Sequence, residues 1–374
     1  MRFKLDSLVD ALFPVLATLA ALAVGAIMLL ILRVNPIEAY GALWEGAFGS
    51  ANAIAETLVK SVPLLLVGLG ICIAFRASVI NIGAEGQMII GGLMATQIGL
   101  IFTDLPGWVV ITMAILAGFL GGAIWGGIPG ALKAYFNVNE ILSTVMMNAI
   151  AVQIMNYMLR GPMIDPAQLE KASKIPQTAR LPEAFRLPRL APTRLHLGFI
   201  IALALAILVY ILLWRTTLGY KIRAVGQNPH ASRYGGIRVR RRIVTALLLS
   251  GALAGIAGAI QVYGVNYRMI TDGSSTGFTG GAGFNGIVAA LFGQLHPLGT
   301  IPASIFFGAL LVGANKMQRA VQIPSALIGA LNGLVVIFVV SSEMWRKKRQ
   351  KQRLSLESDV PPQPPTPISE EVTA

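Results

Sequence analysis

The seven residues Asn81–Gln87 place an ionisable carboxylate and two amides in a stretch that is otherwise apolar and is interrupted by glycine. A charge such as that of Glu85 is costly inside a membrane unless it faces a partner or a wet cavity. Two interpretations are open. Glu85 either pairs with Arg76 or another buried base and only fixes the fold, or the segment lines a route for a solute.

Further amides recur along the candidate helix 141–159. Asn148 and Asn156 are eight residues apart, so they lie on nearly the same face of a helix, and Gln153 lies nearby. Amides of this kind suit a route for a hydroxyl-bearing solute. They equally hold neighbouring helices together in a membrane.

A second glycine-broken polar segment, Gly280–Gly286, roughly echoes the first in the other half of the chain. A pair of interrupted segments in corresponding halves points to a central pathway. The residues that we expect to line this substrate path are Asn81, Glu85, Gln87, Asn148, Gln153 and Asn285.

Motifs for catalysis, metal binding and nucleotide binding are missing from the sequence. It contains neither G-x-S-x-G nor H-E-x-x-H, and no G-x-x-x-x-G-K-[ST] loop for ATP. The histidines His196, His230 and His296 are scattered, and the single cysteine, Cys72, lies in an apolar run. We therefore expect no enzyme, no metal and no cofactor. If the protein works as a pump, the motor is another chain.

The composition indicates an integral membrane protein. Hydrophobic residues make up 55% of the 374 residues and charged residues 13%, against roughly 25% charged residues in a soluble domain. The net charge of +13 does not indicate nucleic-acid binding, because the bases lie in short loops and tails without aromatic residues between them. We predict an all-α protein with about ten transmembrane helices, at 11–32, 58–75, 79–102, 107–131, 141–159, 197–214, 243–263, 283–295, 299–315 and 325–342.

Segment length and loop charge define the expected topology. The candidate 283–295 is short and rich in glycine, so it is either a tilted broken helix or a re-entrant segment. The Lys and Arg content of the loops favours both termini in the cytoplasm, N-in and C-in. We expect a transmembrane domain over 1–345 with an outer loop at 160–196, followed by a basic, proline-rich, disordered cytoplasmic tail at 346–374.

The loop 215–242 holds eight Lys or Arg and no Asp or Glu, which predicts a cytoplasmic location. Asn228 is a good N-cap and Pro229 fits the first helical position. A helix can then run through His230–Tyr234 until Gly235-Gly236 stop it. A helix of under two turns is not stable alone in water, so we expect it to need a docking surface.

Glycines at 118, 122, 126 and 130 repeat along one face of the candidate helix 107–131, and Gly251 and Gly255 repeat the device in 243–263. Spacing of this kind lets neighbouring backbones approach closely. The pattern predicts a tightly packed helix bundle, and it predicts no particular function.

Taken together, four stretches of the chain resemble the permease subunits of bacterial ABC importers, in the branch that handles simple sugars and nucleosides. The resemblance covers most of residues 58–342. At Asn285 this chain departs from the branch, which often carries an acidic residue there. The stretches are Phe75-Arg76 with Asn81–Gln87, Gly219–Pro229 with Gly235-Gly236-Ile237, Leu249–Ala259, and Gly283–Ile287 with His296–Gly299.

The resemblance implies a non-catalytic pore subunit in the bacterial inner (plasma) membrane, surrounded by lipid. It also implies a cytoplasmic ABC ATPase, a second homologous permease subunit or a second copy of this chain, and an extracytoplasmic substrate-binding protein. Nucleosides suit it best as solutes, then simple sugars. The residues that would couple to the ATPase are Asn228, Pro229, His230, Arg233, Tyr234, Gly235 and Gly236.

One alternative belongs to a different class of transporter. An ion-coupled secondary transporter would use Glu85 as its proton or sodium site and would need no ATPase.

Overall fold

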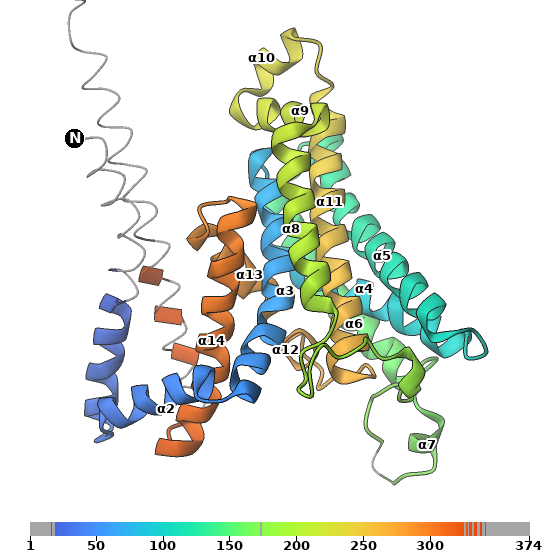
Figure 1. The fold of residues 1–374 in the computed structure, drawn as a ribbon. Helices are drawn as coiled ribbons and strands as arrows, with labels where there is room; N and C mark the ends of the chain where they lie inside the picture. Colours follow the sequence, from blue (N-terminus) through green and yellow to red (C-terminus); the bar gives the residue numbers. More distant parts are fainter. Residues whose placement is uncertain are drawn as a thin grey trace, which may run out of the picture.

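The computed structural model describes residues 19–172 and 174–324, together with residue 16 and isolated positions between 327 and 341. The described part is a bundle of helices, several of which run side by side (Figure 1). Within it, six helices are long and apolar enough to cross a membrane. They are α3 (Ala51–Arg76), α5 (Gly107–Phe136), α6 (Glu140–Arg160), α8 (Gly198–Arg215), α11 (Val239–Ile260) with its π-helical continuation η2 (Gln261–Asn266), and α14 (Pro297–Val321).

The prediction of about ten transmembrane helices was therefore wrong. The helix at Leu19–Ile31 and α13 (Ala282–Phe292) are short. The 11 residues of α13 extend about 16 Å, against a hydrocarbon core of about 30 Å. Helix α4 (Ala84–Ile101) does not reach the hydropathy of a span, since it begins with Glu85 and Gln87.

The same result removes the argument for the N-in, C-in topology, because the count of Lys and Arg on each side assigned the loops to the two sides by assuming ten crossings. The range 325–342 and the tail at 346–374 lie largely or wholly outside the described residues. A window of apolar sequence does not distinguish a helix that crosses the membrane from a shorter one that is buried between others, and that is the physical reason for the error.

Helix α11 lies at the centre of the bundle and packs against α3, α4 and α5. The glycine pattern explains the closeness of this packing. A β-carbon added at Gly122 of α5 would lie 2.7 Å from the Cα of Gly255, and one added at Gly126 would lie 2.6 Å from the carbonyl oxygen of Leu247. The predicted close packing through these glycines is confirmed.

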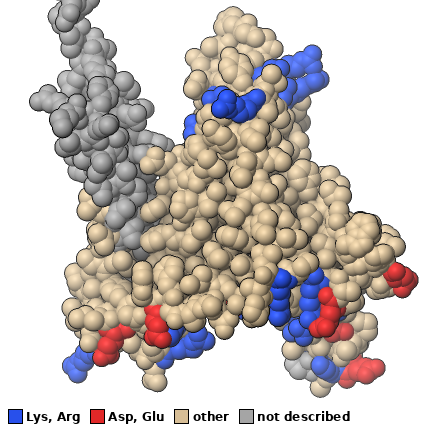
Figure 2. All heavy atoms as spheres, in the orientation of Figure 1, with Lys and Arg blue, Asp and Glu red and all other residues tan. Residues whose placement is uncertain are grey.

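The two ends of the bundle differ in charge. One end carries α9 (Thr217–Gln227) and α10 (Pro229–Tyr234), and only basic residues colour it in the view of Figure 2. The opposite end shows acidic and basic side chains together (Figure 2). It includes the 160–196 loop with its short helices α7 (Pro166–Leu169) and η1 (Glu183–Phe185) (Figure 1).

The 160–196 loop is fastened to the segment that follows η2. The amide of Thr178 donates to the carbonyl of Met269 at 2.9 Å, and that of Leu181 donates to the carbonyl of Tyr267 at 2.8 Å. Two further short helices complete the described chain, α2 (Pro36–Phe48), which packs on α14, and α12 (Thr276–Thr279), which precedes α13.

Candidate functional site

Two helices, α4 and the short α13, meet at their N-terminal ends inside the bundle. The amide of Gly283 donates to Oε1 of Glu85 at 3.1 Å, and Glu85 is fully buried. Helix α4 runs from this point towards the 160–196 loop, whereas α13 runs towards the α9–α10 end. Helix N-termini carry partial positive charge, so two of them stabilise one carboxylate. The two glycine-broken segments are thus in direct contact.

Glu85 forms no ion pair with a base among the described residues. Arg76, its predicted partner, donates instead to the carbonyl of Leu295 at 3.3 Å, at the far end of α13. The guanidinium carbon of Arg76 also lies 5.2 Å from the ring centroid of Trp214. The buried carboxylate is therefore held by backbone amide and helix ends rather than by a counter-charge.

Asn81 and Gln87 hold the turn before α4 in place. The Asn81 amide nitrogen donates to Oε1 of Gln87 at 3.0 Å and to Oγ of Ser250 at 2.8 Å. Asn81, Gln87 and Ser250 are all buried. This network ties the turn to α11, since Ser250 belongs to that helix.

Asn148 makes the matching connection from α6. Its amide nitrogen donates to the carbonyl of Ile82 at 2.9 Å, and its amide oxygen accepts from the backbone of Gly86 at 2.8 Å. Four of the predicted path residues are thereby brought into one buried cluster: Asn81, Glu85, Gln87 and Asn148.

The other two predicted path residues lie apart from these hydrogen bonds. Asn285 is half-buried near the start of α13, and Gln153 is exposed on α6. Asn156 lies one turn beyond Gln153, and its amide oxygen accepts from the hydroxyl of Thr271 at 2.8 Å. These contacts show where the side chains lie in the bundle. The role of all six residues in a substrate path stays a prediction.

Helix α10 has the predicted geometry. The side chain of Asn228 accepts from the amide of Ala231 at 3.0 Å, and Pro229 occupies the first turn. The helix ends at Tyr234, and Gly236 has a φ of +76°, a conformation that suits glycine. The predicted short helix with an Asn-Pro start and a Gly-Gly stop is confirmed.

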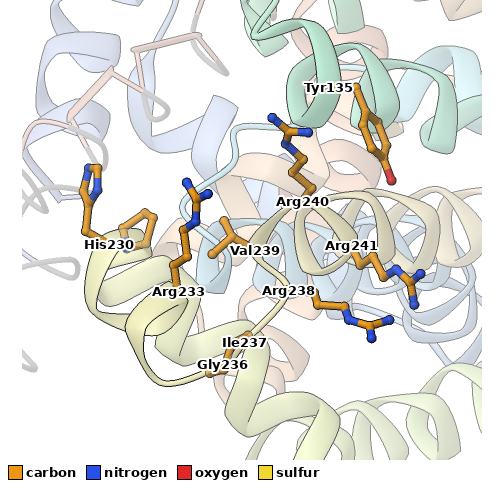
Figure 3. Close-up of a pocket in the computed structure, with 10 residues that line it drawn as sticks. Tyr135, His230, Arg233, Gly236, Ile237, Arg238, Val239, Arg240 and Arg241 are labelled. Atoms are coloured by element: carbon orange, nitrogen blue, oxygen red, sulfur yellow. The ribbon is translucent and has the colours of Figure 1, made fainter.

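A groove of about 680 Å³ separates α10 from the start of α11 and the end of α5. Figure 3 shows Arg233 extending from α10 and Arg240 from α11. The guanidinium carbon of Arg240 lies 5.8 Å from the ring centroid of Tyr135, which belongs to α5. Every charged side chain that lines the groove is basic: Arg233, Arg238, Arg240 and Arg241.

Helix α9 connects this surface to the interior. The hydroxyl of Ser78, in the turn between α3 and α4, donates to the carbonyl of Gly226 at 2.9 Å. A β-carbon added at Gly226 would lie 2.8 Å from the carbonyl carbon of Arg76. On the other side, the guanidinium carbon of Arg223 lies 5.7 Å from the ring centroid of Trp214, to which Arg76 is also close. The end of α9 therefore rests directly on the turn that leads to Glu85.

The sequence interpretation did not single out a cavity of about 250 Å³ between α3, η2, α12 and α14. Lys60 lines it from α3 and lies within the predicted apolar span 58–75. A lysine within a predicted membrane span is the sequence feature that could have pointed to this cavity. The other polar residues that line it are Gln261, Thr279 and Asn315.

The geometry thus consists of two helices that meet at their N-termini, a basic surface helix and a path of contacts between them; the described residues hold six helices long and apolar enough to cross a membrane. Residues 53–340 match the model of a family described as the branched-chain amino acid transport system / permease component. The chain is 37% identical to the guanosine ABC transporter permease protein of Bacillus subtilis, over 88% of this chain and 93% of that protein.

Two further relatives agree. The chain is 33% identical to the glucose ABC transporter permease protein of Haloferax volcanii, over 90% of this chain and 88% of that protein. It is 30% identical to the nucleoside ABC transporter permease protein of Lactococcus lactis, over 88% and 90% of the two chains. Membership of this family implies a cytoplasmic ATPase and a substrate-binding protein as partners. The chain therefore belongs to the family of branched-chain amino acid transport system permease components, as a non-catalytic, membrane-spanning subunit of an ABC transport system.

Proposed function

We propose that this chain forms the translocation path for a nucleoside or a simple sugar, and that α9–α10 couples this path to the ATPase. The names of the relatives support the solute class, since they handle guanosine, nucleosides or glucose. The observation that carries the coupling is the contact of Gly226 with the Arg76–Ser78 turn, because it connects an exposed surface helix to the buried meeting point of α4 and α13.

In this proposal α10 contacts the ATPase on the cytoplasmic side. Tyr234 is 94% exposed at the end of α10, although it is a large aromatic side chain that favours partly buried positions. The neighbouring groove, with its four arginines, suits acidic side chains of a partner. Movement of α10 would pass through α9 to the start of α4 and from there to α13. A second permease subunit, either a homologue or another copy of this chain, would complete the pore.

The ion-coupled alternative receives less support. Glu85 already accepts a backbone hydrogen bond and lies at two helix N-termini, so it does not resemble an empty cation site. The three relatives described above are named as permeases of ABC transporters.

The substitution Tyr234→Asp tests the coupling. Because Tyr234 is almost fully exposed, the change should alter the free energy of unfolding by no more than about 0.5 kcal/mol. We expect loss of ATP-dependent uptake of radiolabelled guanosine or glucose in proteoliposomes that contain the full transporter. Tyr234→Phe, which keeps the ring, serves as the control and should retain most of the uptake.

Co-purification separates the two transport mechanisms. The chain isolated from its native membrane in mild detergent should bring with it an ATPase with a P-loop. Uptake by this chain alone, driven by an ion gradient and indifferent to ATP, would refute the proposed function. Normal uptake by Tyr234→Asp would refute only the role of α10.

A further inference from the structure

The cavity between α3, η2, α12 and α14 has a polar lining in a region where helices are otherwise apolar. Gln261 and Thr279 are buried, Lys60 is half-buried and Asn315 is exposed. The four side chains come from four different elements and converge on one space of about 250 Å³. Helix packing alone does not require such convergence, because apolar side chains fill helix interfaces at lower cost.

Among these groups, Lys60 has the highest free-energy cost of burial, because the charge of a lysine within a membrane helix requires a partner or water. Glu56, one turn away on α3, is already paired with Arg194 of the 160–196 loop at 2.9 Å. Among the described residues Lys60 takes part in no ion pair. Its ammonium group is therefore available to a molecule in the cavity.

The backbone around the cavity is irregular in two places. Gln261 begins the π-helical stretch η2, and short π-helical stretches in α-helices occur frequently at functional sites. Pro63 of α3 also lines the cavity, and its ring nitrogen cannot donate to the carbonyl of Val59 one turn earlier. The cavity thus offers donors and acceptors from side chains beside two irregular stretches of helix backbone.

We propose that this cavity binds the sugar ring of the transported solute, which is the ribose of a nucleoside or a free monosaccharide. This inference rests on the proposed function. Ammonium, amide and hydroxyl groups together supply both donors and acceptors, as the vicinal hydroxyls of a neutral sugar require. The volume lies below the roughly 300–1,000 Å³ of sites for drug-sized ligands, and it suits a single ring.

The location of the cavity connects binding to coupling. Thr279 and Ala282 line the cavity, and the backbone amide of Gly283, the next residue, donates to Glu85 where α4 and α13 meet. A shift of α13 relative to α4 therefore also moves one wall of the cavity. Movement that begins at α10 would open or close the sugar site through this wall.

The test uses the full transporter in proteoliposomes and measures the initial rate of ATP-dependent uptake against the concentration of radiolabelled guanosine, and separately of radiolabelled glucose. Lys60→Met keeps the length of the side chain and removes its donors, and Gln261→Leu removes the amide at similar size. For the transported probe, each variant should raise the half-saturation concentration roughly tenfold or more, as expected for the loss of a hydrogen bond that involves a buried or charged group.

Two controls keep folding apart from binding. Lys316 is the neighbour of Asn315 in the chain, but it does not line the cavity and pairs instead with Glu45 at 2.6 Å. The substitution Lys316→Met should therefore leave uptake within twofold of the wild type. Asn315→Ala alters an exposed cavity residue, so it should raise the half-saturation concentration without a change in the thermal unfolding midpoint.

Selectivity provides a second readout. The wild type should be inhibited better by guanosine than by its 2′,3′-dideoxy analogue, or better by glucose than by a dideoxy sugar, and Gln261→Leu should reduce this preference. If the wild type transports a solute while Lys60→Met, Gln261→Leu and Asn315→Ala all stay within twofold of it, the cavity proposal is overturned and the proposed function stands. If the wild type transports neither a nucleoside nor a sugar with ATP, the proposed function itself fails.

Discussion

The substitution Gly226→Ala should uncouple ATP hydrolysis from uptake, because there is no room for a methyl group where α9 meets the α3–α4 turn. An added β-carbon would lie closest to the carbonyl oxygen of Arg76, 2.8 Å from its carbonyl carbon and 3.0 Å from the amide nitrogen of Ser78. Ordinary contact begins at 3.4 Å. The carbonyl carbon alone must therefore retreat by at least 0.6 Å, and the atoms are backbone atoms, which cannot turn aside as a side chain would.

The magnitude follows from this geometry. An extra methyl group in a packed interior destabilises it by about 1–3 kcal/mol. Alanine offsets part of this loss, because it is more favourable than glycine in a helix by about 1 kcal/mol. We expect a net loss of up to about 2 kcal/mol in the free energy that holds α9 against the turn. Since 1.4 kcal/mol corresponds to a factor of ten, the coupled arrangement should become less populated by a factor of up to about thirty.

The assay compares ATP hydrolysis and solute uptake by the same proteoliposomes. Gly226→Ala should keep at least half of the ATPase activity and lose most of the uptake, so that more ATP is consumed per solute. Gly41→Ala is the matched control, because Gly41 lies in helix α2, away from α9 and α10, and a β-carbon added there would meet nothing within 4 Å. Unchanged uptake per ATP in Gly226→Ala would refute the inference that this contact transmits motion.

Two further predictions concern stability in mild detergent. Gly122→Ala places a methyl group 2.7 Å from the Cα of Gly255 and should destabilise the α5–α11 contact by about 1–3 kcal/mol. Gly127→Ala meets only the flexible side chain of Leu248 and should be neutral. An equal unfolding midpoint for both would contradict this. The pKa of His196 is lowered from its ordinary 6.5 to about 4, first by burial and then by the charge of Arg194. Because the unfolded chain then takes up the proton more readily, stability is lost as the pH falls from about 6.5 towards 4, by about 2 kcal/mol at pH 5. The unfolding midpoints at pH 7 and pH 5 measure this loss, and His196→Gln should abolish it. Equal midpoints at the two pH values in the wild type would contradict the prediction.

Local rules were sufficient for the surface helix and for the helix packing. Asn228, Pro229 and Gly236 act within their own few residues, so capping and backbone preferences predict α10 without knowledge of the rest of the chain. The glycine spacing of α5 also depends only on helix geometry, although its partner, Gly255 of α11, needed the structure to be identified.

Long-range arrangement lay beyond these rules. The ranges 79–102 and 283–295 were predicted as spans from their apolar residues, and only the three-dimensional structure shows that α4 and α13 start at one point inside the bundle. Lys60, Gln261 and Asn315 come from elements separated by up to 255 positions in the chain, and no spacing rule relates them. The partner of Asn148 could not be predicted either, because the sequence does not distinguish an asparagine that hydrogen-bonds to the backbone of a neighbouring segment from one that binds a solute.

The structure also indicates which parts of the bundle move together. Helices α4, α5 and α11 approach through glycines so closely that backbone touches backbone, and such packing leaves little freedom to slide. Helix α13 lies outside this group and packs mainly on α3, where a β-carbon added at Gly286 would lie 2.5 Å from Cγ1 of Val67; it meets α4 at the hydrogen bond between Gly283 and Glu85. A force applied at α9 acts on the Arg76–Ser78 turn, which leads to both connections. Movement at α10 would therefore reach α13, and with it the wall of the Lys60 cavity, through the Arg76–Ser78 turn and α3, while α4, α5 and α11 stay together through their glycine contacts.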